Sequence, residues 1–107
     1  MLYYYVTAMS AVAAIKESML VLATGRSVID PNAAHAYLYS EAPCEASCDV
    51  AGSAFGRKSV ICMRIAEDTV LEEDPNEEPG IYAAAVRSAS DIVITEIVNV
   101  YPAPSWD

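Results

Sequence analysis

The sequence predicts a small α+β domain of two layers, in which one long N-terminal helix packs on an antiparallel sheet of about four strands. Apolar residues recur at helical spacing from residue 7 to residue 24, which indicates an amphipathic helix. Two later segments, 58–66 and 91–101, are rich in β-branched residues, which favour strands. The length of 107 residues suits one domain with an ordinary core, so we treat residues 1–107 as a single unit.

The N-terminal half begins with a short aromatic strand at residues 2–6. Thr7 has the chemistry of an N-cap, and Gly25 suits the residue just past a helix end, so the helix is expected to span about 7–24. A second short helix is expected over 31–40, because Asp30 and Pro31 resemble an N-cap and a first helical residue. The alternation in this segment favours a strand instead, and both interpretations stay open.

The middle of the chain, residues 42–56, predicts a loop or one weak helical turn. The 58–66 segment then predicts a strand, and residues 81–88 predict another that pairs with 91–101. In the 91–101 segment both parities are apolar, which predicts a strand covered on both faces, either central in its sheet or sealed by a second subunit.

Glu96 interrupts the apolar pattern of that last strand. If the carboxylate were buried it would need a partner such as Arg64 or Arg87. A β-bulge at Thr95 and Glu96 that turns the side chain outward is the simpler expectation. After Pro102 the tail 102–107 is expected to be extended, since proline cannot donate to a strand ladder.

Net charge is concentrated in one place. The chain carries −9, yet 67–79 alone holds seven acids and no basic residue, while the other eight acids nearly balance six basic residues. This pattern predicts an acidic loop over 67–79. Direct nucleic-acid binding is not expected, because it requires cations against the phosphates.

Apolar composition and cysteine usage bear on assembly and location. Residues of the hydrophobic class make up 54% of the chain, which suggests that part of the surface is covered by a second copy, in a homodimer or other homo-oligomer, or by a partner protein. No apolar run reaches the roughly 18 residues of a membrane span, so no membrane partner is expected. Three cysteines form no disulfide framework, which favours a reduced, cytoplasmic setting.

No motif for catalysis, metal or cofactor survives inspection. The segment 52–59 resembles a phosphate-binding loop, but Arg57 stands where glycine must precede the lysine. Cys44 and Cys48 alone lack the paired spacing of structural zinc. Residues 74–78 fail the calcium-loop pattern. His35 is the single histidine, and nothing places a nucleophile beside it.

The leading hypothesis is a small acidic, non-catalytic interaction module that docks on a basic surface of another protein. A sharper form is an inhibitor that imitates nucleic-acid charge. The acids expected to bind the partner are Glu67, Asp68, Glu72, Glu73, Asp74, Glu77 and Glu78. The alternative is a ligand-binding domain or small enzyme with a pocket between helix and sheet. That pocket would be lined by Tyr3, Tyr5, His35, Tyr37 and Tyr39.

Overall fold

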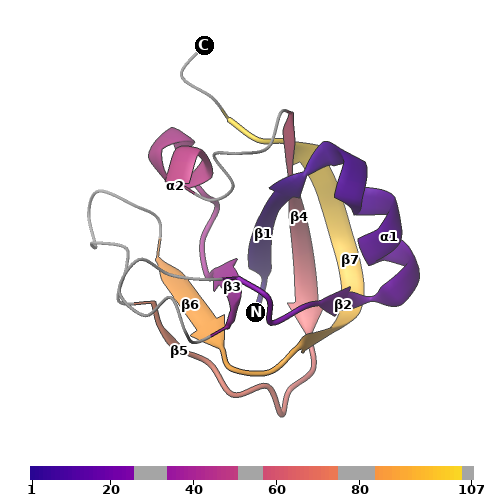
Figure 1. Ribbon diagram of the computed structural model, residues 1–107, viewed down its shortest axis with the longest axis vertical. Helices are drawn as coiled ribbons and strands as arrows, with labels where there is room; N and C mark the ends of the chain where they lie inside the picture. Colours follow the sequence, from indigo (N-terminus) through magenta and orange to yellow (C-terminus); the bar gives the residue numbers. More distant parts are fainter. Residues whose placement is uncertain (26–33, 51–56, 75–83, 105–107) are drawn as a thin grey trace.

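The computed structural model describes residues 1–25, 34–50, 57–74 and 84–104. This part of the chain forms one antiparallel seven-stranded sheet in the order β2-β7-β4-β1-β3-β6-β5 (Figure 1). The strands are β1 (Tyr3–Ala8), β2 (Leu20–Val21), β3 (Ala36–Tyr39), β4 (Lys58–Ile65), β5 (Glu72–Glu73), β6 (Ala85–Ser88) and β7 (Ile92–Pro102). The helices are a 3₁₀ turn η1 (Met9–Ala11) that continues into α1 (Val12–Ser18), and α2 (Glu45–Val50). The prediction of four strands under one long helix is therefore wrong.

The expected helix over 7–24 is short because strands occupy both of its ends. Thr7 is buried within β1 rather than acting as an N-cap, and no side-chain hydrogen bond caps η1 or α1. At the other end Met19 adopts a left-handed conformation with φ 55°, which ends the helix. The following residues enter β2, where Val21 is fully buried against the sheet. Burying this apolar end in a strand outweighs its helical spacing.

The prediction of a helix over 31–40 is also wrong for 34–40, the part of this segment that the structure describes. Residues 36–39 form β3, as the alternating pattern suggested, while 26–33, with the expected cap and proline, lie outside the described residues. Ala36 and Leu38 face the main core, and Tyr39 faces the other side of the sheet. The single helical turn that was one expectation for 42–56 is present as α2.

The strand pairings form a ring. β3 pairs with β1, β1 with β4, β4 with β7 and β7 with β2. Gly25, which follows β2, then bridges His35, the residue directly before β3, through two hydrogen bonds of 2.9 Å. β6 and β5 extend the sheet outward from β3.

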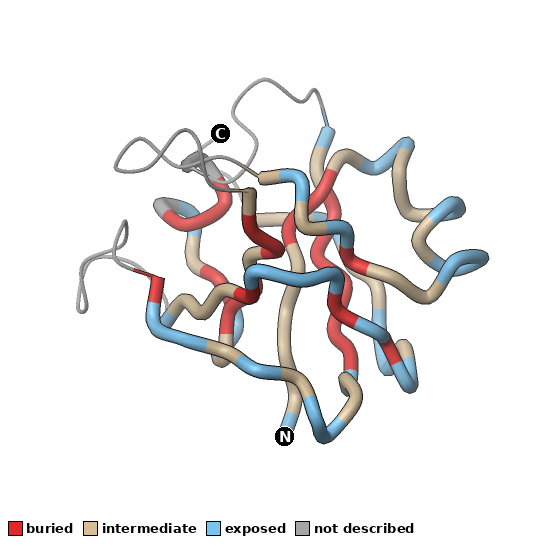
Figure 2. Tube along the Cα trace, turned by 60° about the horizontal axis from the view of Figure 1, so that its bottom comes forward, coloured by how far each residue is buried: buried red, intermediate tan, exposed pale blue. Residues whose placement is uncertain are grey.

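The main core lies inside this ring, and the buried positions run through its strands (Figure 2). Its fully buried members come from four strands of the ring, and side chains of β1 and α1 pack against them. They are Val21, Ala36, Leu38, Ile61, Met63, Ile92 and Ile94. A smaller cluster, Val6, Tyr39, Cys48 and Val60, lies on the opposite face of the sheet and involves α2. The sheet is thus covered on both sides near its centre.

The sequence predicted that the strand within 81–88 would pair with 91–101. The described residues do not form this pairing. β6 pairs instead with β3 and β5. Two hydrogen bonds form in the turn between β6 and β7. The backbone N–H of Ser90 donates to the Ser88 side chain, and the Asp91 carboxylate accepts a 2.7 Å hydrogen bond from the Ala23 backbone N–H. This contact places the start of β7 beside β2.

The first half of β7 buries one face only within a single chain, whereas Tyr101 near its end packs against the smaller cluster on the other face. Ile92 and Ile94 are buried, whereas Val93 and Val98 are about half exposed, at 50% and 47%. Coverage of these positions by a second subunit stays a prediction. The register with β4 shifts between Ile94 and Glu96, which leaves Thr95 without an opposite residue and confirms the expected bulge. Glu96 points outward and accepts a 2.9 Å hydrogen bond from Arg64.

Candidate functional site

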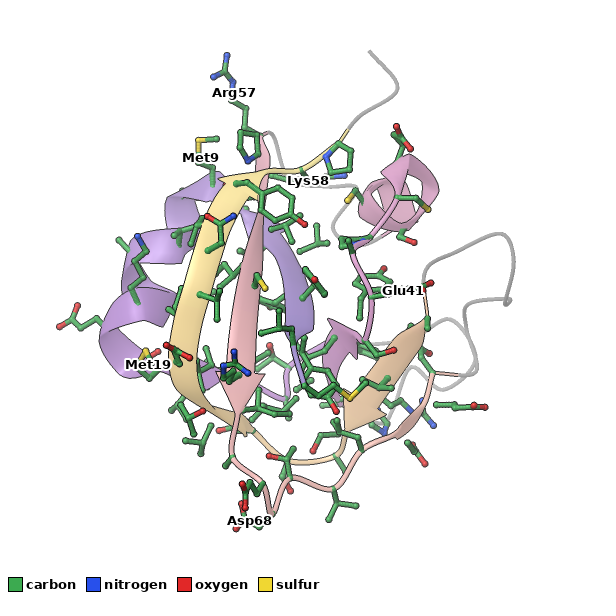
Figure 3. The ribbon with its side chains drawn as sticks, turned by 180° about the vertical axis from the view of Figure 1, so that it is seen from behind. Met9, Met19, Glu41, Arg57, Lys58 and Asp68 are labelled. Carbon is green, nitrogen blue, oxygen red and sulfur yellow. The ribbon has the colours of Figure 1, made fainter. Side chains whose placement is uncertain are left out.

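Of the acids expected to bind a partner, those that the structure describes lie on the segment that leaves β4 and enters β5. Glu67 and Asp68 lie in the exposed turn after β4, where Thr69 closes the turn by donating to the Ala66 carbonyl. In Figure 3 Asp68 stands at this turn, at the far end of β4 from Lys58. The chain then continues into β5, so the expected loop is here partly a strand.

β5 carries Glu72 and Glu73 as the outermost described strand of the sheet. Both residues are exposed, whereas Asp74 is buried and its backbone N–H donates to Ala85 at 3.0 Å. Glu77 and Glu78 lie outside the described residues. We call Glu67, Asp68, Glu72 and Glu73 the acidic strip.

Glu72 belongs to a row of side chains that crosses three strands. Tyr37 on β3 is opposite Arg87 on β6, and Arg87 is opposite Glu72 on β5. Residues directly opposite on an antiparallel pair project from the same face. Arg87 Nε donates to Glu72 Oε1 at 2.6 Å, which is a short, charge-assisted hydrogen bond.

The two partners of this ion pair differ in exposure. The Arg87 side chain is only 16% exposed, while that of Glu72 is 60% exposed. Burial by itself lowers the pKa of Arg87, but its hydrogen bond and charge interaction with Glu72, aided by Tyr37, outweigh the burial and raise the pKa. Arg87 is therefore a permanent cation held against the sheet.

His35 lies beside the same carboxylate. Its Nε2 is 3.9 Å from Glu72 Oε1, and its ring is tilted against the Tyr37 ring with centroids 5.9 Å apart. Among the described residues, His35 Nδ1 is buried without a hydrogen-bond partner, and the Tyr37 hydroxyl, which is also buried, has only the Arg87 guanidinium beside it. Buried polar side-chain atoms are usually hydrogen-bonded, so their coincidence at one place marks an unusual site.

Gly25 makes the packing of Tyr37 possible. A Cβ at this position would lie 2.8 Å from two atoms of the Tyr37 ring and 3.0 Å from the His35 carbonyl oxygen. These separations are below van der Waals contact, so the ring lies directly over the glycine. The bridge that closes the ring of strands thus also supports the Tyr37 and His35 side chains.

The five side chains of the predicted Tyr/His pocket do not share one face of the sheet. Tyr3 and Tyr5 pack against the main core inside the ring. Tyr39 belongs to the smaller cluster, where its hydroxyl donates to the Ser47 carbonyl at 3.2 Å. His35 and Tyr37 remain together, but on the face that carries Tyr39, opposite the main core against which α1 packs.

The cysteines occupy packing positions. Cys48 and Cys62 are buried, Cys44 is partly buried with Sγ 3.4 Å from Ser47 Oγ, and the three thiols form no disulfide. Lys58, next to the glycine-rich segment, donates from Nζ to the Cys48 carbonyl at 2.8 Å and so holds the end of α2. Within the described ranges, no three His, Cys, Asp or Glu side chains are grouped to hold a metal ion.

Arg87 is the residue that sequence reasoning missed at this site. It was considered only as a partner for Glu96, yet Glu96 pairs with Arg64 and Arg87 pairs with Glu72. The available signal was a lone arginine in a small, apolar strand segment, which indicates a cation that needs an anion nearby.

Comparisons with protein-family models, with curated proteins and with solved structures found no match. Among the described helices, none has the length and apolar character needed to cross a membrane.

Proposed function

We propose that this chain is a non-catalytic interaction module that docks on a basic surface of another protein through the acidic strip. The observation that supports this function is the charge balance of the strip. Arg87, the arginine that pairs with the strip in the described part of the chain, is largely buried and engaged with Glu72. Glu67, Asp68 and Glu73 leave their charges exposed on the same segment of the chain.

Such an arrangement suits recognition by charge. Like charges gathered on one segment create a local negative potential that attracts a basic surface and repels an acidic one. Because exposed charges are screened within about 8–10 Å at physiological salt, the attraction should weaken strongly as salt rises. A partner with a nucleic-acid-binding groove is the special case, in which the strip would occupy phosphate positions.

A purely structural explanation competes with this proposal. Charged residues on an edge strand prevent it from pairing with another molecule, and β5 is the outermost of the described strands. The two explanations differ in what neutralisation does. Loss of docking would leave a well-behaved monodisperse protein, whereas loss of edge protection would produce aggregation.

The test compares two double variants with the same change in charge. Glu67→Gln with Glu73→Gln alters the acidic strip, and Glu17→Gln with Glu45→Gln alters exposed acids on α1 and α2. Each raises the net charge of −9 by two units. In affinity purification, the wild type and the control should each capture a basic protein at low salt. Neither should capture it at high salt.

We expect the strip variant to lose at least about tenfold of that capture, equivalent to about 1.4 kcal/mol. Equal capture by both variants would contradict docking through this edge. Light scattering on the same proteins tests the structural explanation, because aggregation restricted to the strip variant would assign the charges to edge protection.

The proposal includes two further features, a homo-oligomer and a cytoplasmic location. The half-exposed valines of β7, Val93 and Val98, support the first, since a second copy would remove them from water. Light scattering of the wild type checks this point, and a monomeric mass across micromolar concentrations would refute it. The three cysteines without a disulfide are in keeping with a reducing compartment.

A further inference from the structure

We propose that Arg87, His35 and Tyr37 form a binding site for a small carboxylate, and that the chain's own Glu72 occupies this site when no ligand is present. The site lies on the face of β3 and β6 that carries Tyr39. The site shares Glu72 with the acidic strip, but it is tested separately from docking, since it concerns the Arg87 cation and the anion bound to it rather than the surplus of exposed acids.

The first step of the argument is the difference between the two charges. The Arg87 side chain is only 16% exposed, and a largely buried cation is costly without an anion, so this position favours a bound carboxylate. Glu72 is mostly exposed and stands on a strand of two residues that pairs with β6 alone in the described structure. The cation is therefore the fixed part and the carboxylate is the replaceable part.

The second step is the convergence of nitrogen groups on one oxygen. Arg87 Nε and His35 Nε2 lie 2.6 and 3.9 Å from the same atom, Glu72 Oε1. This geometry resembles a carboxylate-binding site filled from within the chain. Arginine suits the role because its charge is permanent and its fork of N–H groups matches a carboxylate.

The third step concerns the atoms that Glu72 leaves unused. Among the described residues, His35 Nδ1 is buried without a hydrogen-bond partner, and the Tyr37 hydroxyl is buried with only the Arg87 guanidinium beside it. The His35 side chain is nine-tenths buried and contacts the Tyr37 ring. A carboxylate that carries a neighbouring hydroxyl can offer these atoms the hydrogen bonds that the glutamate side chain cannot.

The net charge of −9 opposes binding of any free anion, so the expected affinity is in the millimolar range. Competition from Glu72 lowers it further in the wild type. Removing the competitor should therefore reveal the site, because an intramolecular carboxylate acts at an effective concentration of the order of millimolar or more.

The test is acetate binding to Glu72→Ala, with Glu73→Ala as a control of equal charge on the same strand. The readout is the Arg87 Nε–H resonance during titration with sodium acetate, with sodium chloride replaced to hold ionic strength constant. We expect a saturable shift with at least tenfold higher apparent affinity in Glu72→Ala than in wild type or Glu73→Ala. If all three respond alike, or none saturates, the proposal is wrong.

Two further arms complete the experiment. Glu72→Gln keeps the side-chain volume and serves if the alanine variant unfolds, with the same expected gain and the same contradictory result. Glycolate, which adds a hydroxyl to acetate, should bind more tightly, and Tyr37→Phe should remove that advantage. Equal binding of glycolate and acetate would exclude the unused hydroxyl from the site.

Discussion

At the scale of single residues, the architecture depends on a few close contacts more than on composition. Gly25 is the clearest case, since it forms the bridge that joins the end of the β2 segment to β3 and lies beneath the Tyr37 ring. The sequence indicated a special role for this glycine, but as the residue past a helix end. Its actual partner is a tyrosine twelve positions away, which no local pattern indicates.

The Gly25 contact leads to a prediction about stability. Gly25→Ala places a Cβ 2.8 Å from the Tyr37 ring and 3.0 Å from a backbone oxygen, so the ring or the bridge must shift. We expect a loss of about 1–3 kcal/mol in the free energy of unfolding, as for other overpacked sites. Urea denaturation measures it through a lower midpoint.

A double-mutant cycle separates the two contacts of that new methyl group. In a Tyr37→Leu background the smaller side chain leaves only the backbone contact, so Gly25→Ala should cost less than in the wild type. Equal cost in both backgrounds would show that the tyrosine ring plays no part in the effect.

At the scale of elements, the sequence predicted the long strands and failed at the short ones. β4 and β7 were identified because their β-branched runs are long, and the bulge at Thr95 followed from one charged residue in an apolar run. β2 and β5 have two residues each, and their pairing depends on distant partners. A segment of that length has no periodicity to detect.

The same limit explains the candidate site. His35 and Tyr37 were singled out with their neighbours, and Glu72 was assigned to an acidic loop. Their proximity follows from the order β3-β6-β5, which places three segments remote in sequence side by side. Sequence patterns gave the residue types, and only the topology brings Arg87 between them.

The attachment of β2 to β7 leads to the second prediction. Only two residue pairs join these strands, and the Asp91 carboxylate adds a 2.7 Å hydrogen bond to the Ala23 backbone. Asp91→Ala leaves that N–H without its acceptor, and we expect a loss of about 1–2 kcal/mol with faster amide exchange at Ala23 and Val21.

Asp91→Asn is the matched control for this anchor, because it keeps an acceptor oxygen at the same position. It should preserve most of the stability and most of the protection from exchange. If alanine and asparagine variants behave alike, the hydrogen bond does not hold β2 in place.

At the scale of the whole molecule, tyrosines on both faces of the sheet link folding to alkaline pH. Burial raises the pKa of Tyr5, and the opposing hydrogen bond with Thr7 only reduces this effect. Burial also raises the pKa of Tyr101 and of Tyr4, with smaller contributions from neighbouring groups that include Cys62. All three phenols thus keep their protons more firmly in the folded chain than in the unfolded one.

The sign of the pH dependence follows from this difference. Below the unfolded phenol pKa of about 10 both states hold the protons, and stability does not depend on these groups. Above it the unfolded chain loses protons that the folded chain retains, so the free energy of unfolding falls as pH rises further. Urea unfolding between pH 8 and about pH 11 should show a plateau and then a decline.

Tyr5→Phe and Tyr101→Phe each remove one of these groups, so each should make the alkaline decline shallower whatever its effect on stability at pH 8. The slope and not the midpoint is the decisive quantity, because losing the hydroxyl also changes contacts such as that with Thr7. The phenol titration, followed by absorbance, should begin at higher pH in folded protein than in protein unfolded by urea. Wild-type and variant curves with the same slope above pH 10 would refute the linkage between these tyrosines and folding.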